Sequence, residues 1–103
     1  MSRGRDPVAS PGPHTVLRRV EGIAWRVIDG EAVLVNVRRD DVMHLNPVAS
    51  FLWKNLDGRS SLEDIARSIT EEYEVGLEEA LSDAVAFAGD LLEQEVAEIV
   101  GVE

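Results

Sequence analysis

The chain has 103 residues and a formal net charge of −10 at neutral pH, and both values restrict the possible architectures. This length allows one domain with a single modest core. Because the sequence contains no cysteine, disulfides and thiolate metal sites are excluded. The two histidines, His14 and His44, lie thirty residues apart, so we expect no histidine metal site and no cofactor. No apolar run reaches the roughly 20 residues of a membrane span, and the N-terminus lacks the apolar core of a signal peptide. We therefore expect a cytoplasmic protein with no membrane partner.

Negative charge is concentrated in the second half of the chain. Residues 60–103 contain thirteen acidic residues and one basic residue, Arg67, whereas residues 1–59 carry a small positive balance. Nucleic-acid affinity comes mostly from cations that displace counterions from phosphates, so the acidic half disfavours nucleic acid as a partner. The acidic residues form either a solvated face that gives solubility or a surface complementary to a basic partner.

The first twenty residues are predicted to be a disordered N-terminal tail, followed by a single domain over residues 21–100. Three of the four prolines fall within residues 1–14, and this segment has no hydrophobic periodicity. Residues 15–21 have a weak strand pattern, for which we expect at most an edge segment.

The segment Gly22–Val37 has the pattern of a β-hairpin. Its two halves alternate in apolar side chains, and Asp29-Gly30 supplies the two positive-φ positions of a type I′ turn. The return strand is apolar on both faces, which places it in the centre of a sheet. After a polar turn, Val42–Leu45 is a short apolar run that suits a third strand. The sequence therefore predicts a three-stranded antiparallel meander with Val42–Leu45 at its edge.

Three helices are predicted after the meander, over residues 47–56, 61–73 and 77–96. Asn46-Pro47 is a helix start, because Asn caps free N–H groups and Pro suits the first helical position. Asp57-Gly58 ends the first helix. Ser60 and Glu63 have the spacing of a capping box for the second helix. Residues 97–103 form either a short strand or a frayed end.

The third helix has an apolar arc wider than one packing partner requires. Its apolar residues span roughly 180°, against the roughly 100° stripe of a helix that packs on one side. An acidic strip of Glu79, Asp83 and Asp90 lies just beyond Phe87. Either the helix is contacted on two sides by its own chain, or one shoulder of the arc faces a groove.

The sequence shows no recognisable catalytic machinery. A nucleophile with a base, a glycine-rich phosphate loop and a metal cluster are all missing from its pattern. Ser50 lies near His44 in the sequence, but no third group completes a triad. His44 is expected on the open face of its strand. We therefore expect no enzymatic activity.

An ordered set of short motifs runs through residues 44–91. It consists of His44-Leu45-Asn46, Ala49, Leu52-Trp53, Leu56-Asp57-Gly58, Ser61, Ile65, Ala66, Tyr73, Asp83 and Leu91. This set resembles the PqqD-like family, whose fold is also called the RiPP recognition element (RRE), and the likeness covers residues 21–100. The resemblance implies an α+β, winged-helix-like fold, with a three-stranded antiparallel β-meander followed by three α-helices.

The resemblance also implies a function and a site. Members of this family are non-catalytic modules that bind the leader segment of a ribosomally synthesised precursor peptide and present it to a modifying enzyme, such as a radical SAM protein. The leader adds as a further strand beside the third strand and packs on the third helix. In this sequence the implied peptide-binding residues are Val42, Met43, His44 and Leu45 on the strand, and Asp83, Ala84, Phe87, Asp90 and Leu91 on the helix.

Two other functions stay open at this point. One is a winged-helix DNA-binding regulator, which the acidic helical half disfavours because a recognition helix needs cations facing phosphates. The other is an accessory subunit that stabilises a radical SAM enzyme without binding any peptide.

Overall fold

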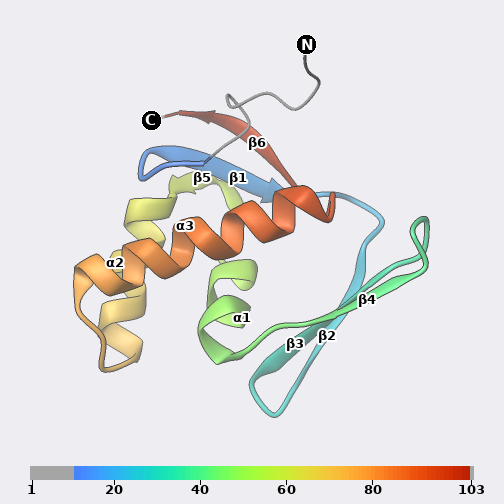
Figure 1. The fold of residues 1–103 in the computed structure, drawn as a ribbon, viewed down its shortest axis with the longest axis horizontal. Helices are drawn as coiled ribbons and strands as arrows, with labels where there is room; N and C mark the ends of the chain where they lie inside the picture. Colours follow the sequence, from blue (N-terminus) through green and yellow to red (C-terminus); the bar gives the residue numbers. More distant parts are fainter. Residues whose placement is uncertain (1–10, 103) are drawn as a thin grey trace.

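The computed structural model describes residues 11–102, and Figure 1 shows how they are arranged. In chain order the elements are β1 (Thr15–Arg19), β2 (Ala24–Ile28), β3 (Glu31–Asn36), β4 (Asp41–His44), α1 (Pro47–Lys54), β5 (Asp57–Ser61), α2 (Leu62–Glu72), α3 (Leu77–Glu93) and β6 (Ala97–Val102). The strands form two separate three-stranded sheets, sheet A with the order β5-β1-β6 and sheet B with the order β2-β3-β4. In Figure 1 α3 crosses between sheet A at the top and sheet B at the lower right. The protein therefore has an α+β fold with three helices.

Sheet B is the predicted meander. β2 and β3 pair in antiparallel register across a tight turn, in which Asp29 and Gly30 have φ values of 53° and 81°. Both values are positive, as a type I′ turn requires. β3 lies in the centre, and its Ala32 and Leu34 side chains are buried. The predicted order of the three strands is confirmed, with β4 at an edge.

Sheet A was not predicted. It corrects two expectations and decides between the two alternatives for the C-terminus. Residues 15–19, assigned above to the tail or to an edge segment, form β1 in the centre of this sheet. Residues 57–61 form β5, although Asp57-Gly58 was expected only to end a helix. Of the two alternatives for the C-terminus, the strand is correct, because residues 97–102 form β6. Residues 1–10 of the expected tail lie outside the described residues.

Side-chain caps determine where α1 and α2 begin. Asn46 accepts a hydrogen bond from the Ala49 N–H at 2.8 Å, which confirms the predicted start of α1. The predicted capping box of the second helix is wrong by one residue. Ser61 caps α2, its hydroxyl accepting from the Asp64 N–H at 3.1 Å, while the Asp64 carboxylate accepts from the Ser61 N–H at 3.2 Å.

The ends of the helices also differ from the prediction. α1 ends at Lys54, α2 at Glu72 and α3 at Glu93, each earlier than expected. Asp57, just after α1, starts a turn in which its carboxylate accepts from the Arg59 and Ser60 N–H groups. The Ser60 bond, with the Arg59 bond next, lowers the pKa of the Asp57 carboxyl.

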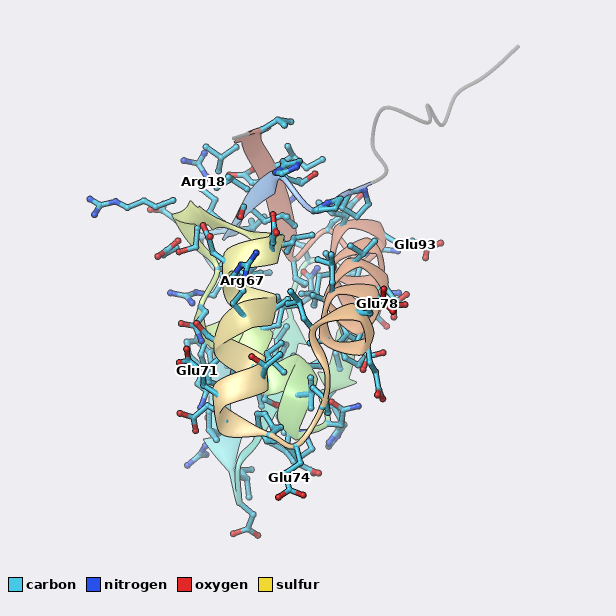
Figure 2. The ribbon with its side chains drawn as sticks, turned by 90° about the vertical axis from the view of Figure 1, so that its left-hand side faces the viewer. Arg18, Arg67, Glu71, Glu74, Glu78 and Glu93 are labelled. Atoms are coloured by element: carbon cyan, nitrogen blue, oxygen red, sulfur yellow. The ribbon has the colours of Figure 1, made fainter. Side chains whose placement is uncertain are left out.

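The core forms where the three helices meet the inner faces of both sheets. Trp53 and Leu52 on α1 are fully buried, as is Leu17 on β1. Arg19 ties sheet A to this region, since its guanidinium donates to the Trp53 and Lys54 carbonyls, both at 3.0 Å. Charged side chains lie outside the core. Figure 2 shows those of Glu71, Glu74, Glu78 and Glu93 pointing outward from the helical layer. Within residues 11–102 no helix is long and apolar enough to cross a membrane.

Candidate functional site

The outer edge of β4 has main-chain groups free to pair with another strand. Among residues 11–102, β4 has one neighbouring strand, β3. The Leu45 N–H donates to the Ala32 carbonyl at 2.9 Å, and the register runs without a shift along the strand. Because bonded and non-bonded pairs alternate in an antiparallel ladder, Met43 also points its N–H and C=O toward β3. Val42 and His44 therefore point theirs toward the open edge.

A buried hydroxyl fixes the end of this strand to α1. Ser50 has no exposed surface. Its Oγ accepts from the Ala32 N–H at 2.6 Å and donates to the Leu45 carbonyl at 3.1 Å. The hydroxyl thus replaces a direct main-chain bond between β3 and the end of β4. Ser50 was considered above only in relation to catalysis, and its role here is to hold the strand edge at a fixed angle to α1.

A groove of about 160 Å³ separates β4 from α3. Its lining residues are Met43, His44, Leu45, Asn46, Ala49, Phe87, Asp90 and Leu91. The groove runs beside the open edge of β4, so a strand added at that edge would place alternate side chains against α3. Most of the lining is apolar, and Asp90 is its single acidic residue.

The structure brings six of the nine predicted site residues together in this groove. These are Met43, His44, Leu45, Phe87, Asp90 and Leu91. The other three, Val42, Asp83 and Ala84, do not line it. Val42 lies at the open edge with 58% of its surface exposed, and Asp83 lies half-buried one turn before Phe87. Ala84 is completely buried, so its side chain belongs to the core.

Asn46 and Ala49 line the groove but were not predicted as site residues. Asn46 had been interpreted only as a helix cap, and it also closes the groove where β4 turns into α1. Both residues belong to the motif that carried the family resemblance, so their presence in that motif was the available signal.

Metal binding and catalysis have little support in the described part of the chain. Among residues 11–102 no group of three His, Cys, Asp or Glu side chains is placed to hold a metal ion. His44, which is exposed, and Ser50, which is buried, have different surroundings, and Ser50 is already bonded to the main chain. The open edge of β4 and the apolar groove beside it have the shape and polarity that suit an extended segment.

Comparisons with known proteins identify a family and similar structures. The family model described as "Coenzyme PQQ synthesis protein D (PqqD)" matches residues 31–97. A solved structure, "TbiB1 in Complex with the TbiA(beta) Leader Peptide", is 26% identical, with a TM-score of 0.70, and the match covers 79% of this chain and 94% of that chain. "Lasso peptide synthetase B1 complexed with the leader peptide" is 29% identical, with a TM-score of 0.70 and coverage of 80% and 96%.

A third structure is the solution structure of the PqqD truncation of Methylobacterium extorquens PqqCD, described as a stand-alone RiPP recognition element. It is 21% identical, with a TM-score of 0.73 and coverage of 87% of this chain and 96% of that chain. At this identity the likeness supports the fold alone. No curated protein matches the chain.

Proposed function

This chain belongs to the PqqD family, and on that premise we propose that it binds the leader segment of a ribosomally synthesised precursor peptide. The leader adds as a strand to the open edge of β4 and packs its alternate side chains into the groove against α3. Strand addition of this kind takes its affinity from main-chain hydrogen bonds and its selectivity from side-chain pockets. Two solved relatives, TbiB1 and lasso peptide synthetase B1, are each complexed with a leader peptide, which supports the proposal.

The observation that carries the proposal is the position of the open β4 edge beside the groove. The outward N–H and C=O groups of Val42 and His44 lie next to the apolar lining supplied by Met43 and Phe87. An extended peptide can pair with these main-chain groups and, at the same time, place alternate side chains in the groove.

The bound peptide is presented to a separate modifying enzyme, for which a radical SAM protein is one candidate class. The domain itself then needs no cofactor and performs no catalysis. The winged-helix-like description of the fold stays a prediction, and so does the alternative of a DNA-binding regulator. α3 contains no Lys or Arg, which disfavours it as a recognition helix. The alternative of an accessory subunit without peptide binding is separated from the main proposal by the following test.

Proline substitutions on β4 test the proposed pairing. His44→Pro removes an N–H that points to the open edge, so it deletes one bond to the leader and obstructs close pairing. One such bond contributes about 0.5–1.5 kcal/mol. We expect His44→Pro to weaken binding by about tenfold or more, as measured by calorimetry with precursor peptides encoded beside the gene.

Two matched variants serve as controls. Met43→Pro removes an N–H that bonds inward to β3, so it should lower the stability of the domain itself. Val27→Pro removes an outward N–H from the opposite edge of sheet B, on β2, and should leave peptide binding unchanged. If no precursor peptide binds more tightly than about millimolar, or if His44→Pro binds as well as the unchanged protein, the domain does not recognise leaders in this way.

A further inference from the structure

Three side chains follow one another along the side of α3 that adjoins the groove. Asp83 lies four residues before Phe87 and Asp90 lies three residues after it, spacings that put all three on one side of a helix. Asp83 is half-buried and Asp90 is exposed. Within residues 11–102 neither carboxylate takes part in a salt bridge. This side of α3 therefore presents an aromatic ring between two carboxylates that have no cationic partner in the described chain.

The spacing of these side chains is within about 2 Å of the side-chain repeat of an added strand. A helix rises about 1.5 Å per residue, so Asp83 and Asp90 lie about 6 Å and 4.5 Å from Phe87 along the axis. Side chains on one face of a strand repeat every two residues, or about 6.6–6.8 Å. Leader residues opposite Met43 and Leu45 point toward α3, because directly paired residues share a face. In a leader strand that runs alongside α3, three successive side chains on that face fall near Asp83, Phe87 and Asp90.

The charges around the groove favour basic side chains at the two outer positions. α3 contains no Lys or Arg along its 17 residues. Arg39 reaches the end of this helix, where its guanidinium donates to the Glu93 carbonyl at 3.2 Å and lies 3.8 Å from the Glu95 carboxylate. That cation is thus already paired with an acid. The middle position meets Phe87, Leu91 and Met43, which suit an apolar side chain.

Building on the proposed function, we propose that the groove selects leaders with the pattern basic–x–apolar–x–basic. The apolar side chain packs against Phe87, and the two basic side chains pair with Asp83 and Asp90. The open β4 edge and the apolar groove form the site, while the two carboxylates decide which peptides it prefers. The pattern reads the same in both directions, so the preference does not depend on the direction of the leader strand.

Synthetic peptides test the preference directly. We would compare three capped peptides that differ only at two positions of a central segment, Lys-Thr-Leu-Thr-Lys, Gln-Thr-Leu-Thr-Gln and Glu-Thr-Leu-Thr-Glu, by fluorescence anisotropy at low salt. Partly exposed ion pairs contribute roughly 0.2–1 kcal/mol each, so each basic residue should improve the dissociation constant by roughly 1.4- to 5-fold. We expect the lysine peptide to bind most tightly and the glutamate peptide least tightly. The difference should shrink near 1 M salt, where the screening length is only about 3 Å.

Substitutions on α3 identify the residues that cause the preference for basic peptides. The double variant Asp83→Asn with Asp90→Asn should make the lysine and glutamine peptides bind equally. Glu78→Gln removes an acid from the opposite side of the same helix and should preserve the difference. Phe87→Ala should weaken all three peptides by a similar factor, because it removes apolar contact and no charge.

The outcomes separate this inference from the proposed function. If the lysine peptide binds no more tightly than the glutamine peptide, including the case in which neither binds, the charge preference is wrong. The same holds if Glu78→Gln abolishes the difference as effectively as the double variant does. Leader binding as such is decided independently by the encoded precursor peptides and His44→Pro, so it stands if those succeed while the charge preference fails.

Discussion

Trp53 is completely buried although its indole carries a polar N–H group. Its side chain has no exposed surface, and within residues 11–102 the indole Nε1 has no hydrogen-bond partner. The Trp25 ring packs against the Trp53 ring, with 5.8 Å between the ring centroids and an angle of 86° between the ring planes. This edge-to-face geometry stabilises aromatic pairs. The Arg19 guanidinium lies 5.4 Å from the Trp25 ring centroid and 5.9 Å from that of Trp53. This cluster joins β1, β2 and α1.

Replacement of Trp53 by Ala should lower the free energy of unfolding by about 3–5 kcal/mol, as for other buried aromatic residues. Trp53→Phe should cost much less, because it keeps a ring in the core and removes the N–H without a partner. Trp25→Ala is the matched control on the exposed side of the pair, where 38% of the residue surface is accessible. Urea titration measures all three. A loss below about 1 kcal/mol for Trp53→Ala would contradict the central position of this side chain.

At the scale of the elements, the junction between β5 and α2 shows how closely caps control boundaries. Ser60 and Ser61 are adjacent and chemically identical, yet the structure assigns them different roles. Ser61 caps α2 together with Asp64, whereas the Ser60 hydroxyl is exposed and donates to the Asp57 carboxylate at 3.3 Å. The sequence pattern favoured Ser60 because Glu63 follows it at the spacing of a capping box.

The two serines provide a matched test of this assignment. Ser61→Ala removes the hydroxyl that accepts from the Asp64 N–H and should cost about 1 kcal/mol of stability, the usual value for an N-cap. Ser60→Ala alters an exposed contact and should stay within about 0.5 kcal/mol of the unchanged protein. Thermal and urea unfolding of both variants measure the difference. An equal or larger loss for Ser60→Ala would show that the cap lies one residue earlier.

At the scale of the whole molecule, sheet A connects the two ends of the described chain. β1 pairs with β5 on one side and with β6 on the other, so residues 15–19 join segments that are more than 35 residues apart in sequence. Leu17 of β1 is fully buried in the common core. The sheet stands on the side of the molecule away from β4, as Figure 1 shows. Its contribution is to complete the core under the helices that carry the groove.

Two shortened chains test where the domain begins. A chain that starts at residue 21, the predicted boundary, lacks β1 and leaves β5 and β6 without their common partner. We expect it to lose cooperative urea unfolding, because a buried strand and its ladder bonds are missing. A chain that starts at residue 11 keeps β1 and should unfold cooperatively. The fold would not depend on β1 if both chains unfolded with the same midpoint and slope.

Local chemistry was enough to predict part of this fold. Asp29-Gly30 determines the hairpin turn because its two positions need positive φ, and Asn46-Pro47 determines the start of α1 because it satisfies free N–H groups. Both features act over a few residues, so the sequence reveals them directly. The edge position of β4 and its proximity to α3 also followed from the sequence, through apolar patterning combined with the family resemblance.

Long-range pairing decided the rest. The segment Asp57–Ser61 is polar and glycine-containing, with little intrinsic strand preference, and it becomes β5 because β1 supplies a partner. The main-chain N–H and C=O of His44 point to the open edge because of the hydrogen-bond register between β4 and β3. The burial of Ala84 depends on how α3 packs. The groove joins Met43 to Phe87, more than forty residues apart in the chain. The sequence by itself determined the turns, the caps and the charge. Only the tertiary structure decided which backbone groups stay unpaired and which side chains share a surface, because both depend on contacts between segments distant in sequence.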